Sequence, residues 1–197
     1  MTPVWLAVTL EGERALRLCN RLIVLVARGR RIASAIRRGS RKSYLEDLNE
    51  AALVRAWAIM DAYLSDRADV LTRREMPIPT SPSAVMISAH SQAIGSIRGS
   101  FERLQAYWKA PLGLRFADYP DWSHLRAFRD LRNALAHRSG FVRLPLAGGH
   151  PPWIVNRLTK AGLSGSYSGK LPVYDSDFDE LIRLVRDFVL WADRQLP

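Results

Sequence analysis

Residues 125–138 read LRAFRDLRNALAHR. Leucine or phenylalanine recurs at positions 125, 128, 131 and 135, which is the spacing of one face of an α-helix. The pattern predicts a helix that begins near Asp121 and ends at Ser139-Gly140, because glycine commonly terminates helices. A helix with one apolar face must pack that face against other elements, so the stretch indicates a helical bundle.

Four further segments show the same helical spacing on either side of this stretch. We expect a helix over residues 11–36, and a second helix opened by a capping box at residues 43–46. A third helix begins at residues 81–82 and stops before Pro111, and the last is capped by residues 176–179. The sequence therefore predicts an all-α, antiparallel up-and-down bundle of about five helices.

The segment before the last helix breaks the helical pattern. Residues 141–174 hold most of the late proline and glycine, and residues 153–155 and 171–174 are predicted to pair as a small hairpin. At 197 residues and 48% hydrophobic, the chain fits one domain over residues 1–197. We expect a single bundle with an irregular or hairpin insert.

Composition excludes several classes of protein. One cysteine, Cys19, forms no disulfide within the chain and fits a reducing compartment. The longest apolar run, residues 22–27, is far shorter than the roughly 20 residues of a membrane span. Residues 4–8 lack the basic region of a secretory signal. These observations predict a soluble, cytoplasmic protein without a membrane partner.

The chain is strongly basic. Its formal net charge is +10, and 25 of its 29 basic residues are arginine. The densest cluster lies within residues 28–42. Such a surface attracts nucleic acid through counterion release. The alternative is an arginine-rich genome, with residues 28–42 as a solvated connection.

The predicted fourth helix carries a chemical motif, Arg132-Asn133-x-x-x-His137, which occurs once. Imidazole, with a reference pKa of about 6.5, acts as acid or base near neutral pH. Guanidinium stays charged and offers a fork of donors to phosphate. The three groups suit cleavage of a phosphodiester. No metal-binding constellation, phosphate-binding glycine loop or serine-hydrolase elbow accompanies them, so we expect neither metal nor cofactor.

Arg132 lies inside the apolar arc of its helix, where an unpaired guanidinium is costly. Either a carboxylate from a neighbouring helix pairs with it, for which Asp61 is a candidate, or the arc meets a solvated cleft. A buried Arg–Asp pair without a catalytic role is the structural alternative. Asn133 either orients the imidazole, contacts a phosphate or is a surface residue.

His137 follows Arg132 by five residues, which rotates it by about 140° around a straight helix. Bringing both side chains to one substrate requires the helix to unwind near Ala136 or a second chain to contribute. The alternative is a favourable interaction between His137 and the helix dipole.

The residues Arg132-Asn133-Ala134-Leu135-Ala136-His137 resemble the Arg-x4–6-His motif of the HEPN superfamily, the higher eukaryotes and prokaryotes nucleotide-binding domains. The resemblance covers about residues 10–195, and its specific part is the motif. It implies a helical bundle that dimerises with a second copy, so that two motifs face each other. It assigns catalytic roles to Arg132 and His137 and a supporting role to Asn133.

Many HEPN proteins are metal-independent endoribonucleases of toxin–antitoxin or phage-defence systems, and others are inactive binding modules. We therefore expect a ribonuclease that leaves 2′,3′-cyclic phosphate ends on RNA, with an antitoxin or a nucleotidyltransferase as a candidate partner. One toxin subgroup has a tyrosine two residues after the histidine, which a nucleotidyltransferase modifies. This chain has Ser139 there, which argues against that regulation. The alternatives are an inactive module that binds nucleic acid, a nucleotide or a protein, and an unrelated helical protein.

Overall fold

The computed structural model describes residues 8–75, 101–109, 113–138, 141–142, 169–170 and 173–195. Its long helices are α1 (Leu10–Ala35), α2 (Arg38–Glu75), α5 (Trp122–Arg138) and α7 (Asp175–Gln195). A shorter helix, α4 (Phe101–Lys109), precedes a single 3-10 turn, η1 (Phe116–Asp118). The predicted all-α bundle is confirmed.

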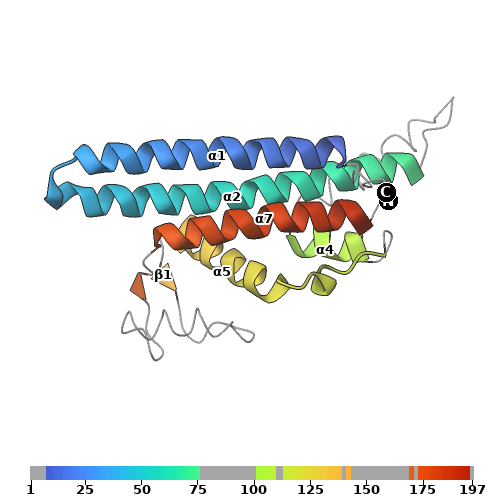
Figure 1. Ribbon diagram of the computed structural model, residues 1–197. Helices are drawn as coiled ribbons and strands as arrows, with labels where there is room; N and C mark the ends of the chain where they lie inside the picture. Colours follow the sequence, from blue (N-terminus) through green and yellow to red (C-terminus); the bar gives the residue numbers. More distant parts are fainter. Residues whose placement is uncertain are drawn as a thin grey trace, which may run out of the picture.

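The helices pack in an order that Figure 1 makes visible. α1 and α2 form a long antiparallel hairpin, and α7 packs along both of them. α5 packs against α2 and α7, on the side away from α1, and α4 lies beside α2. The helix with the Arg132 motif is therefore supported by α2 and α7.

The predicted apolar faces form the core. Buried side chains on these faces include Leu22 of α1, Phe128 of α5 and Phe188 of α7. Trp57 and Trp108 are also fully buried, and Phe116 meets the ring of Phe188 edge-on at 5.4 Å between centroids. Large aromatic side chains bury much apolar area, which is the main stabilising contribution to such a core.

The predicted start of the second helix is wrong. α2 begins at Arg38, so residues 43–46 lie inside the helix instead of capping it. The backbone N–H groups of Ser40 and Arg41 already donate to the carbonyl of Arg37. α1 ends at Ala35, and the first turn of α2 forms directly after this short connection, where packing along α1 outweighs the local capping preference.

Two short strands lie between α5 and α7. β1 (Phe141–Val142) pairs with β2 (Gly169–Lys170) in antiparallel register, Phe141 opposite Lys170. A strand pair in the insert was predicted, but its predicted members were wrong where the structure describes them. Val173 is buried in the core, and the N–H of Tyr174 donates to the Asp177 carboxylate, 2.7 Å away, at the start of α7. Residues 153–155, and the start of the third helix at 81–82, lie outside the described residues.

A buried polar network joins the beginning of α1 to the end of α7. The Asp193 carboxylate accepts hydrogen bonds from the Thr9 backbone N–H at 3.0 Å, the Thr9 hydroxyl at 2.9 Å and the Tyr63 hydroxyl at 2.8 Å. The Arg67 guanidinium lies 3.8 Å from the same carboxylate and 3.9 Å from Glu11. None of the described helices has both the length and the apolar character needed to cross a bilayer.

Candidate functional site

α5 holds Arg132 and Asn133 side by side on a rigid helical turn. Both side chains are half-buried, and Arg132 Nη1 donates a hydrogen bond to Asn133 Oδ1 over 3.0 Å. The amide thus fixes one edge of the guanidinium. These two predicted site residues are brought together by the fold.

The opposite edge of Arg132 is not satisfied in this way. Its Nε atom is buried and has no hydrogen-bond partner among the described residues. The Oδ1 atom of Asp61, on the facing helix α2, is also buried without such a partner. An unpartnered polar atom in a protein interior is energetically costly, and here two such atoms of opposite charge belong to neighbouring helices.

Asp61 and Arg132 influence each other through their charges without forming an ion pair within 4.0 Å between these two described residues. Burial raises the pKa of the Asp61 carboxyl to about 6, above its ordinary value of 3.8. The charge of Arg132, a hydrogen bond from Trp57 and the charge of Arg129 all act to lower this pKa and do not overcome the desolvation. Asp61, the candidate partner of Arg132, therefore interacts with it through space and forms no ion pair with it.

Arg129, one turn before Arg132, has a different environment. Its guanidinium forms an ion pair with Glu102 of α4 and lies over the ring of Phe101, 4.8 Å from the ring centroid. These contacts fix Arg129 against α4. Arg132 differs from Arg129 because its hydrogen bond is made within α5, to the neighbouring Asn133, and not to another helix.

His137 belongs to the last turn of α5, and its side chain lies outside the part of the chain that the structure describes. The helix is continuous through Arg138, so it does not unwind near Ala136. The rotation of about 140° between residues 132 and 137 is therefore retained. Of the two routes to a shared substrate, the contribution of a second chain stays as the prediction.

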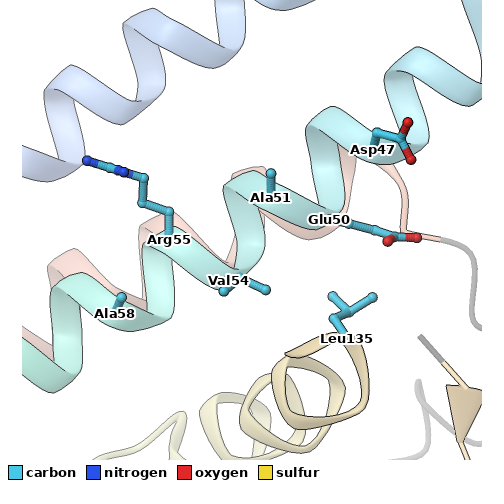
Figure 2. Close-up of a pocket in the computed structure, with 7 residues that line it drawn as sticks. All are labelled: Asp47, Glu50, Ala51, Val54, Arg55, Ala58 and Leu135. Carbon is cyan, nitrogen blue, oxygen red and sulfur yellow. The ribbon is translucent and has the colours of Figure 1, made fainter. Parts of the chain in front are cut away.

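A shallow groove of about 640 Å³ runs between α2 and the end of α5. Figure 2 shows Leu135 pointing from α5 toward Val54, with Glu50 beside it and Arg55 directed away from α5. The full lining is Asp47, Glu50, Ala51, Val54, Arg55, Ala58 and Leu135. The carboxylates of Asp47 and Glu50 disfavour a phosphate, so we do not assign this groove to the phosphodiester.

The groove was not predicted from the sequence. Ala51, Val54 and Ala58 recur at helical spacing on one side of α2, beside the buried side that includes Ala52 and Ala56. Small residues at that spacing are only a weak signal. Their place in a groove depends on where α5 approaches α2 through Leu135, which is a property of the packed helices.

No group of three or more His, Cys, Asp and Glu side chains suited to a metal ion occurs within the described ranges. Comparison with protein-family models, with curated proteins and with solved structures gives no match for this chain. A helical bundle by itself accommodates many functions. The Arg132 motif and its surroundings are therefore the features of this chain from which a function is inferred.

Proposed function

We propose that this chain is a metal-independent endoribonuclease of the HEPN type that leaves 2′,3′-cyclic phosphate ends. The observation that carries the proposal is Arg132, a half-buried guanidinium in the motif whose hydrogen bond to a described residue is the single one from Nη1 to Asn133. A fold stabilises such a group poorly unless a ligand completes its bonds. An RNA phosphate has the charge and the acceptors to do so.

Arg132 then binds the non-bridging oxygens of the scissile phosphate and offsets the charge that develops on them. Asn133 is a positioning residue, because its Oδ1 accepts from Arg132 Nη1 at 3.0 Å and leaves the other donors of the fork available. The Asp61 carboxylate faces Arg132 from α2 and supports the cation electrostatically.

His137 supplies proton transfer. One imidazole takes the proton of the 2′-hydroxyl, and the 2′-oxygen attacks phosphorus. The bond from phosphorus to the 5′-oxygen breaks, and a protonated imidazole gives that oxygen its proton. Two histidines are needed in one turnover, and a homodimer with facing motifs supplies them. The continuity of α5 through Arg138 supports this arrangement, since positions 132 and 137 of one chain are about 140° apart around a continuous helix.

The test is incubation of purified wild type, Arg132→Ala and His137→Ala with end-labelled total RNA in EDTA. Arg126→Ala is the matched control, because Arg126 is an exposed arginine on the same helix. We expect wild type and the control to cleave, and each motif variant to lose about 10²–10⁴-fold in rate. The new 3′ ends are expected to resist phosphatase until acid opens the cyclic phosphate.

The alternatives predict different results. Cleavage by all four proteins indicates a contaminant, and a requirement for added divalent metal contradicts the mechanism. No cleavage by any of them favours the inactive binding module. For a toxin or phage-defence effector, we expect wild type to arrest growth of the expressing cells and His137→Ala to relieve it.

A further inference from the structure

The net charge of the chain is concentrated in one hairpin. Residues 14–45 contain ten of the 29 Lys and Arg residues and none of the 19 Asp and Glu residues. The remainder of the chain therefore has 19 basic and 19 acidic residues and is formally neutral. The net positive charge of the whole protein therefore comes from this one stretch of the chain.

This unit consists of α1 from Arg14 to its end at Ala35, the connection, and the first eight residues of α2. Both helices are regular on either side of it, so the positions of the basic residues are fixed relative to one another. Figure 1 shows the connection at the left end of the bundle, beyond the start of α7. The Arg132 motif lies on a different helix, α5, which packs against α2 and α7.

Four of the ten cations have acidic partners. Arg14 pairs with Asp66, Arg17 with Glu13, and Lys42 with Glu46. Arg30 is half-buried and joins α1 to the start of α7 through Asp175 and Asp179.

The other six arginines are exposed, and none forms an ion pair with a described residue. These six, which we call the basic hairpin cluster, are Arg21, Arg28, Arg31, Arg37, Arg38 and Arg41. A set of unpaired like charges on a rigid scaffold repels itself, so a polyanion that neutralises it is bound favourably.

The residues on the outer side of α1 decide between nucleic acid and an anionic membrane surface as the partner. The apolar side of α1 is already used by the core through Cys19, Leu22 and Val26. Val24, Leu25 and Ile32 are 54%, 55% and 55% exposed on the outer side, where arginines of the basic hairpin cluster lie between them. A membrane-surface helix needs a continuous apolar face with large aliphatic or aromatic residues, whereas these three aliphatic side chains are interrupted by arginine.

We propose that the basic hairpin cluster binds the phosphate backbone of nucleic acid without sequence preference. Arginine suits this role because its planar fork pairs with phosphate oxygens and stays charged at every accessible pH. Arg21 and Arg28 are about 10 Å apart along α1. The cluster therefore contacts several phosphates along a nucleic-acid strand instead of binding a single phosphate. The proposal is independent of the ribonuclease activity, because it needs neither Arg132 nor His137.

The experiment measures binding of a fluorescein-labelled 30-nucleotide RNA of mixed sequence, and of the DNA of the same sequence, by fluorescence anisotropy. All proteins carry His137→Ala, so that cleavage does not interfere. The cluster variant is Arg28→Gln, Arg31→Gln, Arg37→Gln and Arg38→Gln. The control removes the same charge from exposed arginines elsewhere, through Arg115→Gln, Arg126→Gln, Arg183→Gln and Arg194→Gln.

We expect the cluster variant to bind both oligonucleotides at least about tenfold more weakly at 100 mM salt, and the control to change by less than about threefold. The slope of log K against log salt should fall by about 0.7 for each phosphate of a single strand that the variant no longer neutralises. Circular dichroism checks that both variants stay helical, as expected for exposed Arg→Gln changes.

Equal weakening by the cluster variant and the control would overturn the proposal, since it would show a general charge effect. Tight binding to vesicles with 30% phosphatidylserine, abolished in the cluster variant while RNA binding is unchanged, would also overturn it in favour of a lipid surface. Neither result bears on cleavage by the His137-containing protein in EDTA. Failure of the ribonuclease proposal is therefore recognised separately.

Discussion

Asp193 and Asp61 are two carboxylates in the interior of the same bundle, and they differ in how completely they are satisfied. Asp193 accepts hydrogen bonds from Thr9 and Tyr63 and has Arg67 beside it. Asp61 keeps a buried oxygen with no hydrogen-bond partner among the described residues. The first carboxylate joins three helices, and the second faces the arginine of the candidate site.

Asp193 is held in place by its hydrogen bonds, whereas Asp61 retains an oxygen that can still bind a proton or a ligand. Around Asp193, burial together with the neighbouring carboxylate raises the pKa of Tyr63, so that this hydroxyl remains a donor. Around Asp61, burial raises the pKa of the carboxyl itself to about 6. Satisfied polar groups specify one packing arrangement, whereas unsatisfied ones retain the capacity to bind a ligand or a proton.

The largest expected effect comes from removing the satisfied carboxylate. Asp193→Ala leaves the Arg67 guanidinium and the Tyr63 hydroxyl without this buried acceptor, and we expect a loss of about 3–5 kcal/mol in the free energy of unfolding. Urea denaturation measures it. Asp187→Ala is the control on the same helix, because the exposed Asp187–Arg183 pair contributes only about 0–1 kcal/mol. Equal losses in the two variants would show that Asp193 is not special.

A smaller loss of stability is expected when the hydrogen-bond network around Asp193 is crowded by an added group instead of losing its carboxylate. Gly12 packs so closely against the Asp193 carboxylate that an added methyl group would overlap it. We expect Gly12→Ala to lose about 1–3 kcal/mol of stability, although alanine is the better helix former. Gly39→Ala is the matched control, because nothing lies near its new methyl group, and it should be neutral or gain up to about 1 kcal/mol. Thermal and urea unfolding of both variants test this.

The smallest effect is a pH dependence from Asp61. Its pKa is raised in the folded state, so the protein binds this proton more tightly than the unfolded chain does. That contribution is fully present below about pH 4 and is lost as the pH rises through about 6. Because Asp61 is half-buried and partly screened by solvent, we expect a decrease on the order of 1 kcal/mol across this window.

Asp61→Asn should flatten that part of the stability profile, as measured by urea unfolding at several pH values. A profile identical to wild type between pH 4 and 7 would contradict the raised pKa. The two carboxylates are thereby distinguished, because Asp193→Asn is expected to lower stability throughout the range, whereas Asp61→Asn affects mainly its pH dependence.

Local periodicity predicted the helical faces well. The leucine and phenylalanine face of the motif helix, at residues 125, 128 and 131, is buried as expected, and the structure describes that helix from Trp122 to Arg138. The same local reasoning was wrong at residues 43–46, which form no cap, and at Val173, which packs in the core and not in a strand. In both cases packing against a distant helix outweighed a short-range preference of a few tenths to about 1 kcal/mol.

The helical class, the faces that form the core, the motif at residues 132–137 and the total charge could all be predicted without a structure. Each of them depends only on residue type and on spacing along one chain. The tertiary structure decided that Asp193 receives its hydrogen bonds from residues as distant as Thr9, that Asp61 and Arg132 face each other without touching, and that six arginines of one hairpin remain exposed and unpaired with described residues. Those outcomes depend on which helices become neighbours, and desolvation and pairing energies exist only after the helices have packed.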